Sequence, residues 1–122
     1  MIYNIYVEES NKLLSKYSFD KLSSFYFIFS DSTRLKIIFL LINSNLSVNS
    51  MSKILGVSNS LISHQLAILK NKDIITFNRD GKSKIYSLTD NHIKEVFEIG
   101  LEHIAEQDEK IRKDLETISS KI

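Results

Sequence analysis

One β-hairpin signal interrupts a chain whose pattern is otherwise helical, and this combination constrains the fold more than any other feature. Residues 74–88, IITFNRDGKSKIYSL, hold two β-prone runs on either side of Asp80-Gly81. An Asp-Gly pair between such runs is typical of a tight hairpin, because glycine tolerates a positive φ. Elsewhere the chain has no proline, and its apolar residues recur mainly at helical spacing. The sequence therefore predicts a mainly α chain with a small β-hairpin.

Two helical segments joined by a short turn precede the hairpin. The first, SVNSMSKILG, ends at Gly56, a typical C-terminal stop, and the second, SNSLISHQLAILKNK, begins with Ser58 as its expected N-cap. The residues expected to face inward are Met51, Ile54 and Leu55 in the first helix and Leu61, Ile62, Leu66 and Leu69 in the second. Two helices joined by a glycine-containing turn, the second with a polar outer face, describe a helix-turn-helix unit.

The order of the expected elements is more specific than any single one. Before the helix-turn-helix we expect a helix over about residues 3–17, a second that Asp20 would cap and a third that begins at Asp31 or Ser32. After the hairpin, Thr89 or Asp90 would cap a closing helix that runs to about residue 118. This order predicts a winged helix-turn-helix, which dimerisation would stabilise further.

Basic residues gather in the middle of the chain, although its overall net charge is only +1. Residues 43–86 hold six Lys and Arg against two Asp, a net of +4, and residues 87–122 hold five basic against nine acidic residues, a net of −4. Such asymmetry indicates a polyanion-binding centre and a tail with a different role. Charge alone fits an ordinary solvated surface equally well.

The composition excludes several other classes of protein. The chain has no cysteine, which rules out disulfides and thiolate metal sites. Its longest apolar runs, FYFIF and IIFLLI, are too short to cross a bilayer. Its first residues, MIYNIYVEES, lack the basic segment of a signal peptide. We therefore expect a cytoplasmic protein that does not associate with membranes.

Three stretches carry a resemblance to a known family. They are SDSTRLKIIFLL at residues 30–41, SVNSMSKILGVSNSLISHQLAILKNKDII at residues 47–75 and GKSKIYSLTD at residues 81–90. With these motifs in this order and spacing, the chain resembles the ArsR/SmtB family of bacterial metal-responsive repressors from residue 20 to residue 107. Ser32 departs from the family pattern, which often has proline there, with little expected effect on the helix start.

The resemblance implies that the second helix of the helix-turn-helix enters the major groove of double-stranded operator DNA. The implied base and phosphate contacts are Asn59, Ser60, Ser63 and His64. Positive charges position a protein on DNA without reading its sequence, and those expected to do so are Lys70, Arg79, Lys82 and Lys84. The alternative is the solvated face of an ordinary surface helix. His64 has no carboxylate nearby in sequence and is left out of any metal site.

The closing helix places two histidines on an otherwise apolar stripe. His92 and His103 are eleven residues apart, so they point within roughly 20° of each other but lie about 16 Å apart along the axis. Zinc holds its ligands at about 2 Å, so one straight helix cannot supply both. Two antiparallel copies of the helix can. Nearly the same two-fold axis would place Asp90 of one copy opposite Glu106 of the other, and His92 of one copy opposite His103 of the other. That axis would cross near Phe97 and Glu98, and the expected close-packed centre of the pair is Val96, Ile99 and Gly100.

The resemblance also implies a metal site, because Asp90, His92, His103 and Glu106 look like the ligand set of the family's zinc sensors that bind at the dimer helix. Two imidazoles and two carboxylates suit tetrahedral Zn²⁺, with Co²⁺ as a substitute. Ni²⁺ is less suited, because the family's nickel sensors recruit further ligands, often histidines, and no histidine follows His103. The histidine matching His103 is further implied to bond a backbone carbonyl close to Asp73. The alternative is a pair of half-buried histidines hydrogen-bonded to carboxylates.

The expected function is that of a homodimeric DNA-binding transcriptional repressor whose operator binding is released by a divalent metal, zinc above all. The single expected domain, residues 1–122, comprises an N-terminal helical extension (1–19), a DNA-binding core (20–88) and a C-terminal dimerisation helix (89–118). A metal-independent winged-helix regulator is the alternative. A small zinc hydrolase is disfavoured, because four protein ligands leave no position for water. No enzyme is expected.

Overall fold

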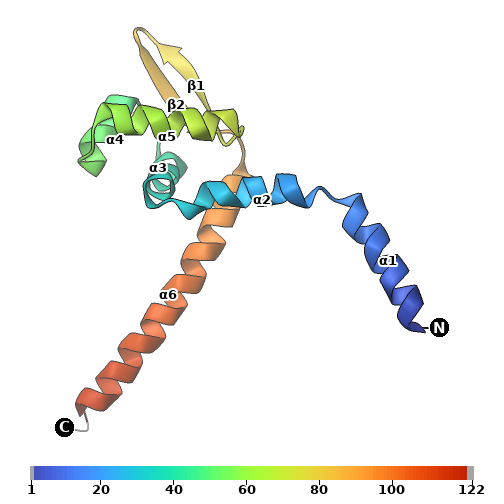
Figure 1. The fold of residues 1–122 in the computed structure, drawn as a ribbon. Coiled ribbons are helices and arrows are strands. Elements are labelled where there is room, and N and C mark those ends of the chain that lie inside the picture. The colour runs from blue at the N-terminus through green and yellow to red at the C-terminus, as the bar shows by residue number, and fades with distance from the viewer. Residues whose placement is uncertain (1, 121–122) are drawn as a thin grey trace.

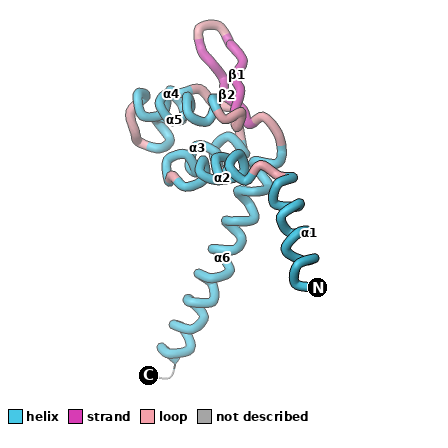
Figure 2. The backbone as a smooth tube through the Cα atoms, turned by 45° about the vertical axis from the view of Figure 1, so that its right-hand side comes forward, coloured by secondary structure: helices cyan, strands magenta, loops and turns pink. Residues whose placement is uncertain are grey.

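The computed structural model describes residues 2–120, and residues 1, 121 and 122 of the expected domain lie outside this part. Its elements are, in order, α1 (Ile2–Lys16), α2 (Phe19–Phe27), the short 3₁₀ helix η1 (Ile28–Ser30), α3 (Ser32–Asn43), α4 (Val48–Leu55), α5 (Asn59–Asn71), β1 (Ile75–Asp80), β2 (Ser83–Leu88) and α6 (Asn91–Ser120). The helix-turn-helix α4–α5 and the hairpin lie on one side of α3, whereas α1 and α6 project away from this body (Figure 1, Figure 2). The predicted mainly helical fold with one small hairpin is confirmed.

Side-chain and glycine caps explain where the helices begin and end. The hydroxyl of Ser18 accepts a backbone N–H of the first turn of α2 at 3.3 Å, so Ser18 is the cap and the prediction of Asp20 was wrong. Asp20 instead lies in the first turn, where a negative charge favours the helix dipole. Asp31 caps α3 by accepting from the backbone N–H of Arg34 at 3.0 Å. Gly56 ends α4 with a φ of 68°, a left-handed conformation that glycine adopts at little cost.

The hairpin forms the wing and is anchored at its base. β1 and β2 pair antiparallel along their length, and the last pair is Asp80 opposite Ser83. The turn therefore consists of Gly81 and Lys82, one residue later than the predicted Asp-Gly pair. Gly81 has a φ of 62°. The backbone N–H of Tyr86 donates to the carbonyl of Leu46 at 2.8 Å, and the reverse bond is 3.2 Å. This bridge fastens the wing to the loop between α3 and α4.

The core lies where α3, α4, α5 and the base of the wing meet. Its fully buried side chains include Ile37 and Ile38 of α3, Met51 of α4, Ile62, Leu66 and Leu69 of α5, and Ile74 just before β1. Burying an aliphatic side chain of this size contributes about 1.5–3 kcal/mol. The inner stripe of α5 is therefore held firmly, which leaves its opposite face to solvent.

Two residues that were predicted to face inward are exposed. Ile54 is 58% and Leu61 is 36% exposed, so these predictions were wrong. Each lies one position, or about 100° of helix rotation, from the residues that actually pack. A short surface helix buries only a narrow stripe, and in α5 that stripe consists of Ile62, Gln65, Leu66 and Leu69. Among residues 2–120, no helix is long and apolar enough to cross a membrane.

Candidate nucleic-acid interface and metal centre

The outer face of α5 carries the four polar residues expected at DNA. Ser58 caps this helix by accepting from the backbone N–H of Leu61 at 3.1 Å, and the buried stripe fixes which side turns outward. The residues left exposed on that side include Asn59, Ser60, Ser63 and His64. The structure therefore brings all four together on one accessible face, in the N-terminal half of the helix.

Four exposed cations flank this face. Arg79 and Lys84 lie directly opposite each other on the wing, Lys82 lies in its turn, and Lys70 lies near the end of α5. Like charges placed opposite each other destabilise a hairpin. Within residues 2–120, none of the four has a carboxylate in ion-pair contact. The charges are thus available to an anion outside the chain.

Phe77 on β1 organises two of these cations. The Nζ atom of Lys70 lies 5.2 Å and that of Lys84 lies 4.7 Å from the centre of the Phe77 ring, within the range of a cation–π contact. The ring itself packs against Tyr86 at 5.5 Å between centroids. Phe77 therefore joins the basic end of α5 to the basic wing. Sequence reasoning missed this role, although strand alternation places Phe77 on the same face as Arg79.

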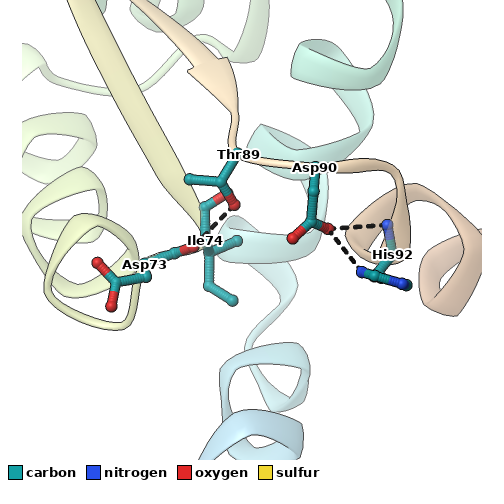
Figure 3. A network of polar contacts seen from close by, with 5 residues as sticks. All are labelled: Asp73, Ile74, Thr89, Asp90 and His92. Atoms are coloured by element: carbon teal, nitrogen blue, oxygen red, sulfur yellow. Dashed lines mark hydrogen bonds and ion pairs between the residues drawn. The ribbon is translucent and has the colours of Figure 1, made fainter.

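The first of the expected metal-donor pairs lies at the start of α6. An Oδ1 atom of Asp90 accepts from the backbone N–H of His92 at 2.8 Å and lies 3.3 Å from Nδ1 of the same histidine (Figure 3). Asp90 thereby caps α6 and holds the imidazole next to its own carboxylate. The side chain of His92 is 82% exposed, so this pair is open to a ligand.

The second donor pair lies further along the same helix. His103 and Glu106 are exposed and three residues apart, which places them on one face. The Nε2 atom of His103 lies 3.2 Å from the side-chain nitrogen of Gln107.

The structure does not bring the two donor pairs together within one chain. Among residues 2–120, no group of three or more His, Asp or Glu side chains gathers as metal ligands. Each pair nevertheless combines an imidazole with a carboxylate, which are donors that Zn²⁺ takes in proteins. A site that used all four side chains would therefore need a contribution from a second chain.

Thr89 connects the first half-site to the recognition helix. Its Oγ1 donates to the carbonyl of Asp73 at 2.8 Å, and its backbone N–H donates to the carbonyl of Ile74 at 3.1 Å (Figure 3). Asp73 follows the end of α5 and has a φ of 57°, which is uncommon for a residue other than glycine. The backbone close to Asp73, where the resemblance implied an acceptor for His103, is thus bonded within this chain by the Thr89 hydroxyl. Sequence reasoning considered Thr89 only as a cap.

An apolar groove of about 740 Å³ separates α6 from the α2–α3 face. Its lining includes Tyr26, Phe29, Leu35, Phe39, Val96, Phe97, Gly100, Leu101 and Ile104. The rings of Phe39 and Phe97 approach to 6.0 Å at its floor, whereas Leu101 and Ile104 remain about half exposed. Ile99, beside the groove on α6, is 67% exposed. A contiguous apolar patch of this kind is typical of a protein–protein contact.

Comparison with known proteins places these features in a family. Residues 31–76 match the family described as bacterial regulatory protein, arsR family. The chain is 31% identical over 88 residues to the transcriptional repressor SmtB homolog of Synechocystis sp., covering 72% of this chain and 67% of the relative. It is 33% identical over 98 residues to the cadmium resistance transcriptional regulatory protein CadC homolog of Staphylococcus aureus, covering 80% and 81%.

A solved structure shares the fold. It is the homodimeric winged helix-turn-helix DNA-binding domain of a possible ArsR-family regulator from Mycobacterium bovis, with a TM-score of 0.65 at 19% identity over 73% of this chain and 82% of that one. The order of the elements and this likeness define a winged helix-turn-helix fold. The chain belongs to the ArsR/SmtB family of transcriptional repressors, which includes metal-sensing members. The relatives are regulators and not enzymes, which confirms the predicted family and class.

Proposed function

We propose that this protein represses transcription in the cytoplasm by binding double-stranded operator DNA as a homodimer, and that a divalent metal, above all Zn²⁺, releases the DNA. The observation that carries the proposal is the split donor set on α6. Asp90 with His92, and His103 with Glu106, form two exposed pairs of identical chemistry. Each pair thus offers one imidazole and one carboxylate, which are donors that Zn²⁺ takes in proteins.

At the DNA, α5 would enter the major groove, whose width admits one helix. The side chains that would meet bases and phosphates there are Asn59, Ser60, Ser63 and His64. The cations that would hold the phosphate backbone are Lys70, Arg79, Lys82 and Lys84. The like-charged Arg79–Lys84 pair and the lack of ion pairs at these four cations among the described residues support a phosphate-binding role, because phosphate would neutralise charges that the chain itself leaves unpaired.

The dimer would form along α6, with two copies antiparallel. The apolar groove and the exposed side chain of Ile99 supply surface for such a contact, and the M. bovis domain with the same fold is homodimeric. In this arrangement residues 1–19 are an N-terminal extension, residues 20–88 are the DNA-binding core and residues 89–118 are the dimerisation helix of one domain, residues 1–122.

Each end of the paired helices would collect Asp90 and His92 from one subunit and His103 and Glu106 from the other. Bound Zn²⁺ would supply a crosslink between the two closing helices, and Co²⁺ could replace it. Ni²⁺ is less suited to this donor set. One relative is a cadmium resistance regulator, but this chain has no cysteine, and soft metals prefer thiolates. Because Thr89 adjoins Asp90 and bonds the end of α5, the half-site is mechanically connected to the recognition helix.

Zinc should weaken operator binding, because the crosslink and the operator would favour different arrangements of the same dimer. The measurement is fluorescence anisotropy with DNA from upstream of the protein's own gene, with and without Zn²⁺. A coupling of typical size predicts about 5- to 150-fold weaker binding with metal, reversed by a chelator. Mg²⁺ at the same concentration is the control and should have no effect. Tight binding that zinc leaves unchanged would instead identify a metal-independent regulator.

Replacing Phe77 with leucine should weaken DNA binding without changing sequence preference. The leucine keeps an apolar side chain but removes the ring on which Lys70 and Lys84 rest. Losing contacts of about 0.5–1 kcal/mol predicts about two- to fivefold weaker binding, equal for operator and unrelated DNA. Phe77→Tyr keeps the ring and should bind as the parent does. If Phe77→Leu binds as tightly as Phe77→Tyr, the ring does not organise the lysines for DNA.

A further inference from the structure

Arg34 is a buried cation that the DNA and metal sites do not use. Its side chain lies at the start of α3 and is 7% exposed. Its Nε donates to the carbonyl of Ile28 at 2.9 Å, one Nη donates to the carbonyl of Phe27 at 3.4 Å, and the other donates to Oε1 of Gln65 at 3.2 Å. In the described part of the chain no carboxylate pairs with it. The guanidinium carbon also lies 5.8 Å from the centre of the Phe27 ring. A buried charge that is held by neutral groups alone is costly.

The three acceptors belong to two distant parts of the protein. Phe27 and Ile28 lie where α2 passes into η1, between Tyr26 and Phe29, which line the apolar groove. Gln65 lies in the middle of α5, 31 residues beyond Arg34, and is itself only 8% exposed. One rigid guanidinium therefore joins the recognition helix to the backbone directly beside the groove.

This bond differs in kind from the other contacts of α5. The helix also packs through Ile62, Leu66 and Leu69, but the hydrophobic effect that drives this packing is non-directional. The guanidinium offers donors in a fixed planar fork, which binds its acceptors in one orientation. Because Gln65 follows His64 directly, a rotation of α5 about its axis that breaks this bond also turns the DNA-reading face.

We propose that Arg34 is a positioning residue that fixes the rotation of α5 relative to the α2–η1 segment through Gln65, so that operator recognition depends on how this segment is held at the groove. The inference rests on the proposed operator binding. It assigns a role to two buried polar residues that contact neither DNA nor metal.

The test compares Gln65→Met with Leu66→Met, in metal-free protein. Gln65→Met leaves Arg34 its two carbonyl bonds and so preserves the fold, while Leu66→Met places the same side chain in the buried stripe without removing a polar contact. Gln65→Met should lower operator affinity about tenfold, as expected for a lost hydrogen bond to a charged group. Affinity for unrelated DNA, which depends on charge, should stay unchanged. Leu66→Met should preserve both affinities.

Gln65→Glu retains the acceptor and should restore most of the operator affinity. Equal operator affinities for Gln65→Met and Leu66→Met would overturn the positioning role. A parent protein that does not prefer operator over unrelated DNA would instead overturn the proposed function, so the two failures are distinguishable.

A second measurement needs no DNA. The chain lacks cysteine, so spin labels can be placed at Ser23→Cys in α2 and Ala67→Cys in α5, both exposed. With labelled chains diluted in unlabelled ones, electron–electron distance spectroscopy reports the α2–α5 separation within one chain. Gln65→Met should broaden or shift a distribution that is narrow in the parent and in Leu66→Met. An unchanged distribution would overturn the inference whatever the DNA experiments give.

Discussion

Replacing His103 with alanine should lower the affinity for Zn²⁺ by about 100-fold or more. Loss of an outer-shell partner of a metal ligand lowers metal affinity by about 10- to 100-fold, and loss of the ligand itself should cost at least as much. His103 is exposed on α6, where its Nε2 atom lies close to the side chain of Gln107, so the substitution removes no buried contact. Isothermal titration of the metal-free protein with Zn²⁺ measures the effect directly. DNA binding without metal should remain, because α5 and the wing are untouched.

Glu102→Ala is the matched control for this substitution. Glu102 is the neighbour of His103 on the same exposed stretch of α6, but it is not one of the four proposed donors. The control should bind Zn²⁺ as the parent does, and its operator complex should still dissociate when zinc is added. A His103→Ala protein with the parental titration curve would remove this residue from the metal site and would leave the DNA-binding role standing.

Local patterns predicted the elements of the fold, because each depends on a few adjacent residues. The Asp-Gly pair predicted the hairpin, Gly56 predicted the end of α4, and Asp31 or Ser32 was expected to begin α3; the structure has the hairpin, the stop at Gly56 and Asp31 as the cap. The errors also have local causes. Ser18 and Asp20 are both good caps, and the choice between them depends on where the chain turns after α1.

The site was predictable only in part, because several of its contacts join distant segments. The exposed polar face of α5 follows largely from its apolar periodicity, but the same pattern also assigns Gln65 to this face, which is wrong because Gln65 is only 8% exposed. The contact between Arg34 and Gln65 spans 31 residues, and that between Thr89 and Asp73 spans 16, so no pattern of neighbouring residues indicates them. The four proposed donors form two pairs in the sequence, and among the described residues a single chain keeps those pairs apart.

The shared site predicts that two variants, each unable to bind zinc tightly, regain tight binding when mixed. In a His92→Ala dimer both sites lack one histidine, and the same holds for a His103→Ala dimer. In the mixed dimer, one end is complete. The His103→Ala chain contributes its Asp90 and His92 there, and the His92→Ala chain contributes its His103 and Glu106. The other end lacks both histidines. This outcome follows from the two-fold relation alone, because each end takes one half-site from each subunit.

The experiment unfolds and refolds equal amounts of the two variants together and then titrates with Zn²⁺. Half of the dimers should be mixed and each should hold one complete site, so tight binding should saturate at about one ion per four chains. The matched control refolds the parent with the His92→Ala/His103→Ala double variant, which carries the same number of alanines. Mixed dimers of that pair have one missing histidine at each end, so only the parental dimers should bind tightly. If mixing the single variants restores no tight binding, the donors do not meet across the subunit boundary, and the two half-sites on α6 cannot be the sensor.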